Sequence, residues 1–238
     1  LTATDMDIAI VESVPAVIDT GGSTTAPAHT LYDIVRKLPD GAQIELDSGS
    51  DGQMTLRAGR SEFTLQTLPK EDFQQTDGGD LPHQFALSAN DLRGLIDRTR
   101  FAISTEETRY YLNGIFMHTT AGDSGDVMRS VATDGHRLAR VEMPVPDGAA
   151  GMPGVIVPRK TVGELRKLID EIGDDIDIAL SDTSVRFAFD NAVLTSKLID
   201  GTFPDYDRVI PDGNDKTLEV DCDDFAAAVD RVATISTE

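Results

Sequence analysis

The sequence predicts an α+β fold in which one unit, made of antiparallel sheets with helices on one face, recurs along the chain. Short segments with alternating apolar residues are joined by short polar turns, which is typical of antiparallel strands. Several motifs also recur at a spacing of about 130 residues, which indicates an internal repeat of whole domains.

The repeat is visible in four pairs of segments. Ala3-Thr4-Asp5 is followed by an apolar run and a proline, and so is Ala132-Thr133-Asp134. The other pairs are Leu31–Leu38 with Val162–Leu168, Phe63–Leu68 with Val193–Leu198, and Phe85–Thr105 with Leu218–Thr237. Chance similarity is the alternative, and the nearly constant spacing of separate pairs argues against it.

The phase of the repeat predicts the domain organisation. Residues 1–79 are expected to be the end of one unit, 80–206 a complete unit, and 207–238 the start of another. Gln74 to Asp80, which contains two glycines, is predicted to be a linker. On this interpretation the chain is a portion of a three-unit protein, without the start of the first unit and most of the third.

Three amphipathic helices are predicted, each opened by a potential capping residue. Thr30 with Asp33, Ser88 with Asp91, and Thr161 with Glu164 supply the expected N-terminal signals. The inward faces are expected to be Leu31, Ile34, Val35 and Leu38 in the first helix, Leu92, Leu95, Ile96 and Thr99 in the second, and Val162, Leu165, Ile169 and Ile172 in the third.

Strands are predicted where apolar residues alternate with period two. The clearest cases are Phe63-Leu65-Thr67, Ile176-Ile178-Leu180 and Val185-Phe187-Phe189. Asp182-Thr183-Ser184 and Asp190-Asn191 are expected to form the turns between the later strands.

The composition is that of an ordinary globular protein, with 39% hydrophobic and 26% charged residues. Cys222 is the single cysteine, so no intrachain disulfide is possible and a reducing compartment is expected. No apolar run approaches the length of a membrane span, and the first residues include acids where a secretory signal carries bases. These features predict a cytoplasmic protein.

The net charge of −21 and the pI of about 4.4 argue against a conventional nucleic-acid-binding protein. The positive charge is nevertheless concentrated in the helical segments: His29–Leu38 and Asp91–Arg100 each carry +1, and Val157–Leu168 carries +3. These segments together carry +5, so the rest of the chain carries −26. Any solvated helix can carry such residues, but their recurrence at repeat-related positions favours one cationic surface that contacts phosphates without sequence preference.

The sequence contains no glycine-rich phosphate loop and no cysteine–histidine cluster with zinc spacing. Asp134-Gly135-His136-Arg137 is the segment that most resembles an enzyme site, and a metal-dependent hydrolase centred on Asp134 and His136 is one alternative. A polar loop between two strands and a ligand-recognition loop without chemistry are the others. A repeat scaffold unrelated to DNA also stays open at this point.

Four motifs carry a specific family resemblance. They are Arg109-Tyr110-Tyr111-Leu112-Asn113-Gly114, Val131-Ala132-Thr133-Asp134-Gly135-His136-Arg137-Leu138-Ala139, Val155-Ile156-Val157-Pro158-Arg159-Lys160, and Thr195-Ser196-Lys197-Leu198-Ile199-Asp200-Gly201 with Phe203-Pro204-Asp205-Tyr206. In this order and spacing they closely resemble the β subunit of bacterial DNA polymerase III, the sliding clamp family, over essentially the whole chain.

The resemblance implies three similar domains per protein and a head-to-tail homodimer that closes into a ring. Helices would line an inner channel around duplex DNA, and antiparallel sheets would form the outside. The family acts as a non-catalytic processivity factor of the DNA polymerase holoenzyme, without a metal or other cofactor. Its partners are duplex DNA, bound without sequence preference, the replicative polymerase subunit, the clamp loader and other clamp-motif proteins.

The resemblance also implies two sets of binding residues. The peptide-binding pocket would use Leu112, Thr133, Gly135, His136, Arg137, Leu138, Pro204, Arg208 and Val209. The DNA-binding residues would be Arg93, Arg98, Arg100, Arg109, Tyr110, Tyr111, Arg159, Lys160, Arg166 and Lys167.

Overall fold

The computed structural model describes residues 1–49, 51–73, 78–123, 125–211 and 213–236. The chain divides into two compact units, Leu1–Phe203 and Pro204–Glu238. Every pair of neighbouring strands in the described residues is antiparallel, as the sequence predicts. Among those residues, no helix has both the length and the apolar character needed to cross a membrane.

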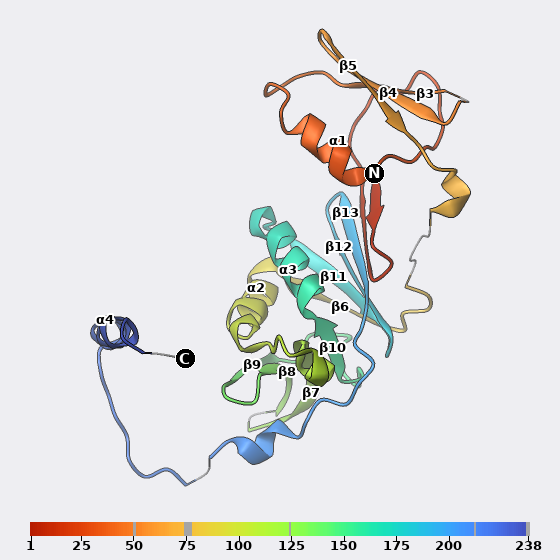
Figure 1. Cartoon of the computed structure of the whole chain (residues 1–238). Helices are drawn as coiled ribbons and strands as arrows, with labels where there is room; N and C mark the ends of the chain where they lie inside the picture. Colours follow the sequence, from red (N-terminus) through yellow and green to blue (C-terminus); the bar gives the residue numbers. More distant parts are fainter. Residues whose placement is uncertain (50, 74–77, 124, 212, 237–238) are drawn as a thin grey trace. The chain divides into compact units, whose positions relative to one another are not determined.

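A six-stranded sheet joins the two ends of the first unit (Figure 1). Its order is β1 (Thr2–Thr4), β2 (Ile8–Glu12), β13 (Ala192–Lys197), β12 (Ser184–Phe189), β11 (Asp175–Leu180) and β6 (His83–Ser88). Ile10 of β2 pairs with Leu194 of β13, so strands more than 180 residues apart in sequence are neighbours. The predicted alternation in β11 and β12 is confirmed, because Ile176, Ile178 and Phe187 are buried.

Two further sheets complete the first unit. A four-stranded sheet has the order β10 (Val155–Pro158), β7 (Gly114–Gly122), β8 (Gly125–Thr133) and β9 (Leu138–Pro144). A three-stranded sheet consists of β3 (Glu45–Ser48), β4 (Gln53–Ala58) and β5 (Ser61–Gln66). Leu65 of β5 is buried as predicted, whereas Thr67 lies just beyond the strand and donates its backbone N–H to the Gly52 carbonyl.

Helices α2 (Ala89–Asp97) and α3 (Arg159–Leu168) lie side by side and contribute to one core with the four- and six-stranded sheets (Figure 1). Leu92 of α2 and Leu165 of α3 are buried, and so are Ile115 of β7 and Phe187 of β12. Full burial of an aliphatic or aromatic side chain of this size contributes about 2 kcal/mol each. The inward faces predicted for these two helices are therefore confirmed, with Ile172 only partly buried beyond α3.

The start of α2 is as predicted: the Ser88 hydroxyl accepts a hydrogen bond from the Asp91 backbone N–H at 3.0 Å. The capping predicted for Thr161 and Glu164 is wrong. Helix α3 begins at Arg159, directly after the extended backbone of Pro158. Thr161 lies inside the first turn and is buried, with its hydroxyl 2.6 Å from the Ser196 hydroxyl. A proline that ends the preceding strand can thus start the helix without a side-chain cap.

The same departure recurs in α1 (Ala28–Val35), which follows Pro27 and does not begin at Thr30. Leu31, Ile34 and Leu38 are partly buried. Val35 is 39% exposed, so its predicted inward position is wrong. Pro27 and Pro158 are matching positions of the repeat, and both helices use the same kind of start.

Short 3-10 segments connect these elements: η1 (Lys70–Asp72), η2 (Arg100–Ala102), η3 (Glu107–Leu112) and η4 (Ile169–Glu171). Residues 74–77 of the predicted linker lie outside the described residues, and residues 78–80 have no regular structure. Gly78 and Gly79 have φ angles of 77° and 69°, a conformation that glycine adopts at little cost.

The second unit contains η5 (Tyr206–Val209) and α4 (Cys222–Ala233). The Asp221 side chain caps α4 by accepting hydrogen bonds from the backbone N–H groups of Asp223 and Asp224. Ser88 before α2 and Asp221 before α4 occupy matching positions of the predicted repeat, so the repeat also fixes where these helices begin.

Candidate functional site

The turn between β8 and β9 carries the segment that most resembles an enzyme site. The Thr133 hydroxyl donates to the Arg137 carbonyl at 2.7 Å and accepts from the Gly135 N–H at 3.1 Å. One oxygen of Asp134 accepts the backbone N–H groups of His136 and Arg137 at 2.9 and 3.0 Å. The other oxygen accepts from Arg137 Nε at 2.9 Å. Both oxygens of Asp134 are therefore used to build the turn.

The turn between β1 and β2 has the same construction. The Thr4 hydroxyl donates to the Ile8 carbonyl at 3.0 Å and accepts from the Met6 N–H at 3.1 Å. Asp5 Oδ1 accepts the N–H groups of Asp7 and Ile8 at 3.0 and 2.8 Å. Asp5 Oδ2 binds a cation, the Lys160 ammonium. The recurring Ala-Thr-Asp motif is thus a hairpin turn.

The shared construction of the two hairpin turns argues against a hydrolase site at Asp134 and His136. In the first hairpin Asp7 stands where His136 stands in the second, yet the turn keeps the same hydrogen bonds. The Asp therefore serves the backbone whether or not a histidine is present. Among the described residues, no three His, Cys, Asp or Glu side chains form a group that could hold a metal ion.

The segment η3 packs against the β8–β9 turn. Arg109 forms a two-pronged ion pair with Glu106, with Nε–Oε2 and Nη2–Oε1 distances of 2.8 and 2.5 Å, and this pairing lowers the pKa of Glu106. The Arg109 guanidinium also lies against Gly135, where an added Cβ would come within 2.5 Å of Nη1. Gly135 has a φ of 91°, a backbone conformation that favours glycine.

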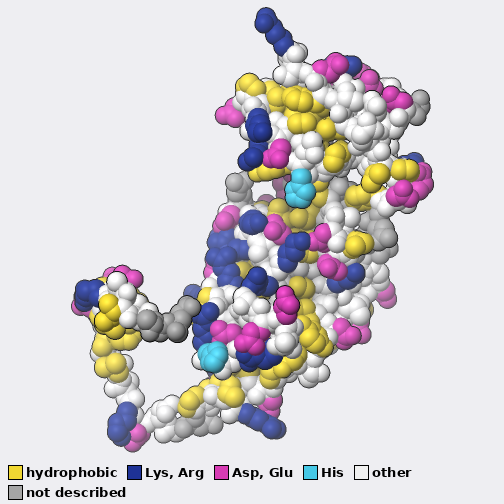
Figure 2. Space-filling model, viewed as in Figure 1, with side chains coloured by type: hydrophobic (Ala, Val, Ile, Leu, Met, Phe, Trp, Pro, Cys, Tyr) yellow, Lys and Arg dark blue, Asp and Glu magenta, His cyan; other side chains and the backbone are white. Residues whose placement is uncertain are grey.

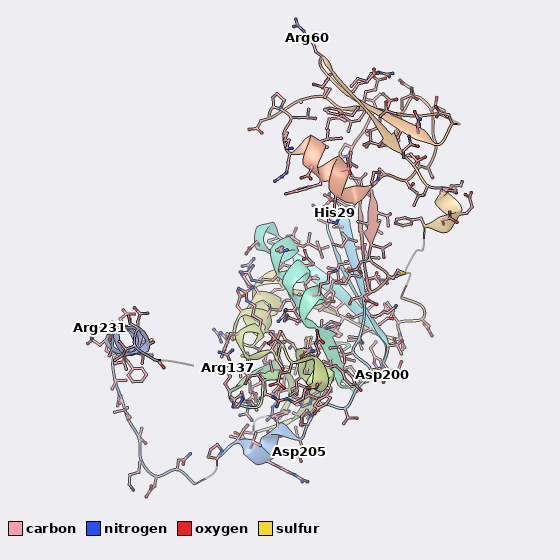
Figure 3. All side chains as sticks on the ribbon, viewed as in Figure 1. His29, Arg60, Arg137, Asp200, Asp205 and Arg231 are labelled. Atoms are coloured by element: carbon pink, nitrogen blue, oxygen red, sulfur yellow. The ribbon has the colours of Figure 1, made fainter. Side chains whose placement is uncertain are left out.

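Arg137 extends from the same turn to the molecular surface (Figure 3). Its guanidinium carbon lies 5.7 Å from the centre of the Phe101 ring, in the range of a cation–π contact. Tyr110, half exposed at 53%, and Tyr111 pack beside Gly201, where an added Cβ would meet the Tyr111 Cβ at 3.1 Å. The η3 segment therefore contacts both the β8–β9 turn and the segment that follows β13.

Cationic side chains gather over the part of the first unit that contains α2 and α3, interleaved with acidic ones (Figure 2). Arg98 and Arg159 are exposed. Arg100 pairs with Asp97 at 3.2 Å, and Lys167 pairs with Glu164 at 3.0 Å. The remaining cations of these helices are Arg93 and Arg166, which lie between the helices, and Lys160, which binds Asp5.

Comparison with known proteins identifies the family of this chain. The family model described as "DNA polymerase III beta subunit, N-terminal domain" matches residues 1–77, and the model of the central domain matches residues 86–205. The chain belongs to the DNA polymerase III β subunit family, the β sliding clamps.

The β sliding clamp of Caulobacter vibrioides is 56% identical over 238 residues, and that of Escherichia coli K12 is 39% identical over 241 residues. Each match covers the whole chain, and the chain spans 64% of the length of each of these relatives. The crystal structure of the Bartonella birtlesii sliding clamp bound to griselimycin has a TM-score of 0.94 and 55% identity, covering 100% of this chain and 63% of that one. A Caulobacter crescentus clamp structure has a TM-score of 0.92 and 56% identity, covering 99% and 64%.

The expected pocket residues of this sliding-clamp chain fall in both units. In the first unit, Thr133, Gly135, His136, Arg137 and Leu138 are brought together in and beside the β8–β9 turn. Leu112 ends η3, is buried, and accepts the Ser104 N–H through its carbonyl.

The other three expected pocket residues lie in the second unit. Pro204 is exposed. Arg208 pairs with Asp205 at 2.7 Å, and Val209 is 69% exposed.

Several acidic partners of the expected DNA-binding cations were not predicted. Asp97, Glu106 and Glu164 each stand three residues before the cation that they bind, and this spacing is a recognisable helical signal. Asp5 binds Lys160 across 155 residues of sequence, so no local pattern reveals that pair.

The hydrogen bonds of the β8–β9 turn predict a pH dependence of stability. The N–H groups of His136 and Arg137, together with the Arg137 guanidinium, lower the pKa of Asp134 from 3.8 to about 2. A lowered pKa means that the ionised Asp134 stabilises the folded state above about pH 4, and that this contribution disappears as the pH falls towards 2. The Asp134→Asn variant should unfold about 3 °C below the wild type at neutral pH.

The difference between wild type and variant should shrink between about pH 4 and pH 2, as measured by thermal unfolding at several pH values. Asp5→Asn is the matched comparison, because the pKa of Asp5 is also lowered to about 2, chiefly by Lys160. A difference that stays constant through this pH range would contradict the role assigned to Asp134.

Proposed function

We propose that this chain acts in a processivity factor, a non-catalytic clamp that holds a DNA polymerase close to duplex DNA. Membership in the sliding-clamp family carries the proposal. A tether of this kind works by raising the effective concentration of the polymerase at its template and requires no bond chemistry. We also propose a cytoplasmic location, which is where a protein that acts on replicating bacterial DNA is expected to work.

The proposed assembly is a ring of repeated clamp domains. We assign residues 1–79 to the first domain, 80–206 to the second and 207–238 to the third. Strand β2, whose hairpin repeats the β8–β9 hairpin, pairs with β13 at the end of the second domain. Strand β9 is at the edge of its sheet within the described residues, so we expect it to pair in the same way with a third domain.

Continuation of this pattern between two copies of the protein would give a head-to-tail homodimer. Such an interface uses different surfaces on its two sides, and it produces a closed ring when the rotation per domain completes a circle. The helices of each domain would then line the central channel, and the sheets would form the outside.

Duplex DNA is the proposed occupant of the channel. The segments that contain α2 and α3 supply a cationic surface for phosphates, whose contacts carry no sequence information and suit a protein that slides. Tyr110 and its neighbours in η3 are proposed to lie near the DNA as well. The acidic remainder of the chain would repel DNA from other surfaces.

The proposed peptide pocket combines the β8–β9 turn with residues around η5. Leu138 and Val209 offer apolar surface for the hydrophobic side chains of a partner peptide, and Gly135 allows its backbone to approach. Arg137 and Arg208 can bind peptide carboxylates or carbonyls. The partners proposed for this pocket are the replicative polymerase subunit, the clamp loader and other clamp-motif proteins.

Primer extension tests the proposed function. The test uses a protein of the relatives' full length that contains this chain, here called the full-length clamp. We expect it to lengthen the DNA products that a polymerase makes in one binding event. The increase should be roughly 100-fold on a primed circular template in the presence of clamp loader and a polymerase trap. Products of unchanged length would contradict the proposal, and polymerase without clamp loader is the control.

A further inference from the structure

At the contact between α2 and α3, here called the seam, the Arg166 guanidinium binds two carboxylates. Arg166 Nε lies 2.8 and 2.9 Å from the two oxygens of Asp97, and Arg166 Nη1 bonds to Asp170. The Arg166 side chain is only 16% exposed, compared with 49% for Arg100, which shares Asp97. Two carboxylates compensate one guanidinium, so little attraction is left for a phosphate.

Arg93 crosses the same seam from the other helix. Its Nη2 donates to the Ile169 carbonyl at 2.8 Å, and its Nη1 donates to Asn90 Oδ1 at 2.9 Å. Ile169 is the C-cap of α3, so Arg93 satisfies a carbonyl at the end of that helix, where a positive charge is favourable. Arg93 from α2 and Arg166 from α3 therefore bind each other's helices.

Two other cations of these segments differ sharply. Arg98 and Arg159 are exposed, and within the described residues neither guanidinium takes part in an ion pair or a hydrogen bond. A phosphate can displace only water and counterions from such a side chain, whereas it would have to break existing ion pairs at Arg166.

We propose that Arg93 and Arg166 are positioning residues that fasten α2 to α3, while Arg98 and Arg159 contact the phosphates of duplex DNA. This inference rests on the proposed DNA-binding function and divides its cations into two roles. Because Arg93 and Arg166 hold the two helices together, Arg98 and Arg159 stay at a fixed separation.

Matched methionine variants of the full-length clamp test this division. Arg93→Met, Arg166→Met, Arg98→Met and Arg159→Met each remove one positive charge and keep a long side chain. Binding to a fluorescent duplex would be measured by anisotropy from about 50 to 200 mM salt, because the slope of log affinity against log salt reports the number of phosphate contacts. Arg98→Met and Arg159→Met should each reduce the magnitude of the slope by about 0.9.

Arg166→Met and Arg93→Met should leave the slope unchanged and lower the midpoint of thermal unfolding by about 5 °C, whereas Arg98→Met should leave the midpoint unchanged. Arg166→Lys keeps the charge but loses the planar fork, so it should not restore the midpoint. Full restoration by lysine would overturn the positioning role.

An equal loss of slope in Arg166→Met and Arg98→Met, with no change in either midpoint, would overturn the whole division. A wild-type clamp without any affinity for duplex DNA would refute the proposed DNA contacts of Arg98 and Arg159 together with the DNA-binding function. The unfolding midpoints would still decide whether Arg93 and Arg166 fasten the helices.

Discussion

Simultaneous replacement of His136, Leu138 and Val209 by alanine should weaken the binding of a polymerase-derived clamp-motif peptide to the full-length clamp by about 100-fold or more. Anchoring side chains of a peptide gain most of their binding energy from apolar surface that becomes buried around them. Leu138 is partly exposed and Val209 is 69% exposed, so both have apolar surface available to a partner. His136 is exposed on the same turn as Leu138.

The measurement is a peptide titration by calorimetry or fluorescence anisotropy. A matched control is the triple alanine variant at Val17, Ile18 and His29, which removes two exposed aliphatic side chains and one exposed histidine from another part of the chain. This control should bind the peptide as the wild type does. Unchanged affinity in the first variant, or an equal loss in the control, would refute the pocket assignment.

The order of the elements and the repeat could be predicted because they depend on local patterns. The apolar stripe of α2 and the alternation in β11 and β12 follow directly from sequence periodicity. The Ala-Thr-Asp motif could be found as a repeat, but its role as a hairpin turn required the hydrogen bonds of Asp5 and Asp134.

The start of α3 could not be predicted correctly because tertiary packing uses the polar side chain that resembles a cap. Thr161 contacts Ser196 of β13 in the core, which leaves the start of α3 to Pro158. A close backbone approach is equally invisible to sequence patterns: a Cβ on Gly114 would lie 2.3 Å from the Val157 carbonyl oxygen. Such contacts depend on which strands become neighbours.

The expected DNA-binding surface illustrates the same limit. Counting charges along Asp91–Arg100 and Val157–Leu168 identifies where cations are concentrated, but the seven cations of these two segments look alike in the sequence. The structure separates them by their partners, because Arg166 is held by Asp97 and Asp170 whereas Arg98 is exposed. The local charge of these segments therefore predicts where a cationic surface lies. The contacts in the structure then indicate which of its side chains are free to bind a phosphate.

We propose that the protein encircles DNA and is held there by its closed shape. The most direct test loads the full-length clamp onto a nicked circular duplex with the clamp loader, and then follows its retention by gel filtration in about 0.5 M salt, where phosphate contacts are weak. The clamp should stay with the circle and should dissociate at least about 100-fold faster once the same DNA is cut to a linear form. Equal retention on circular and linear DNA, or immediate loss from both, would contradict the claim.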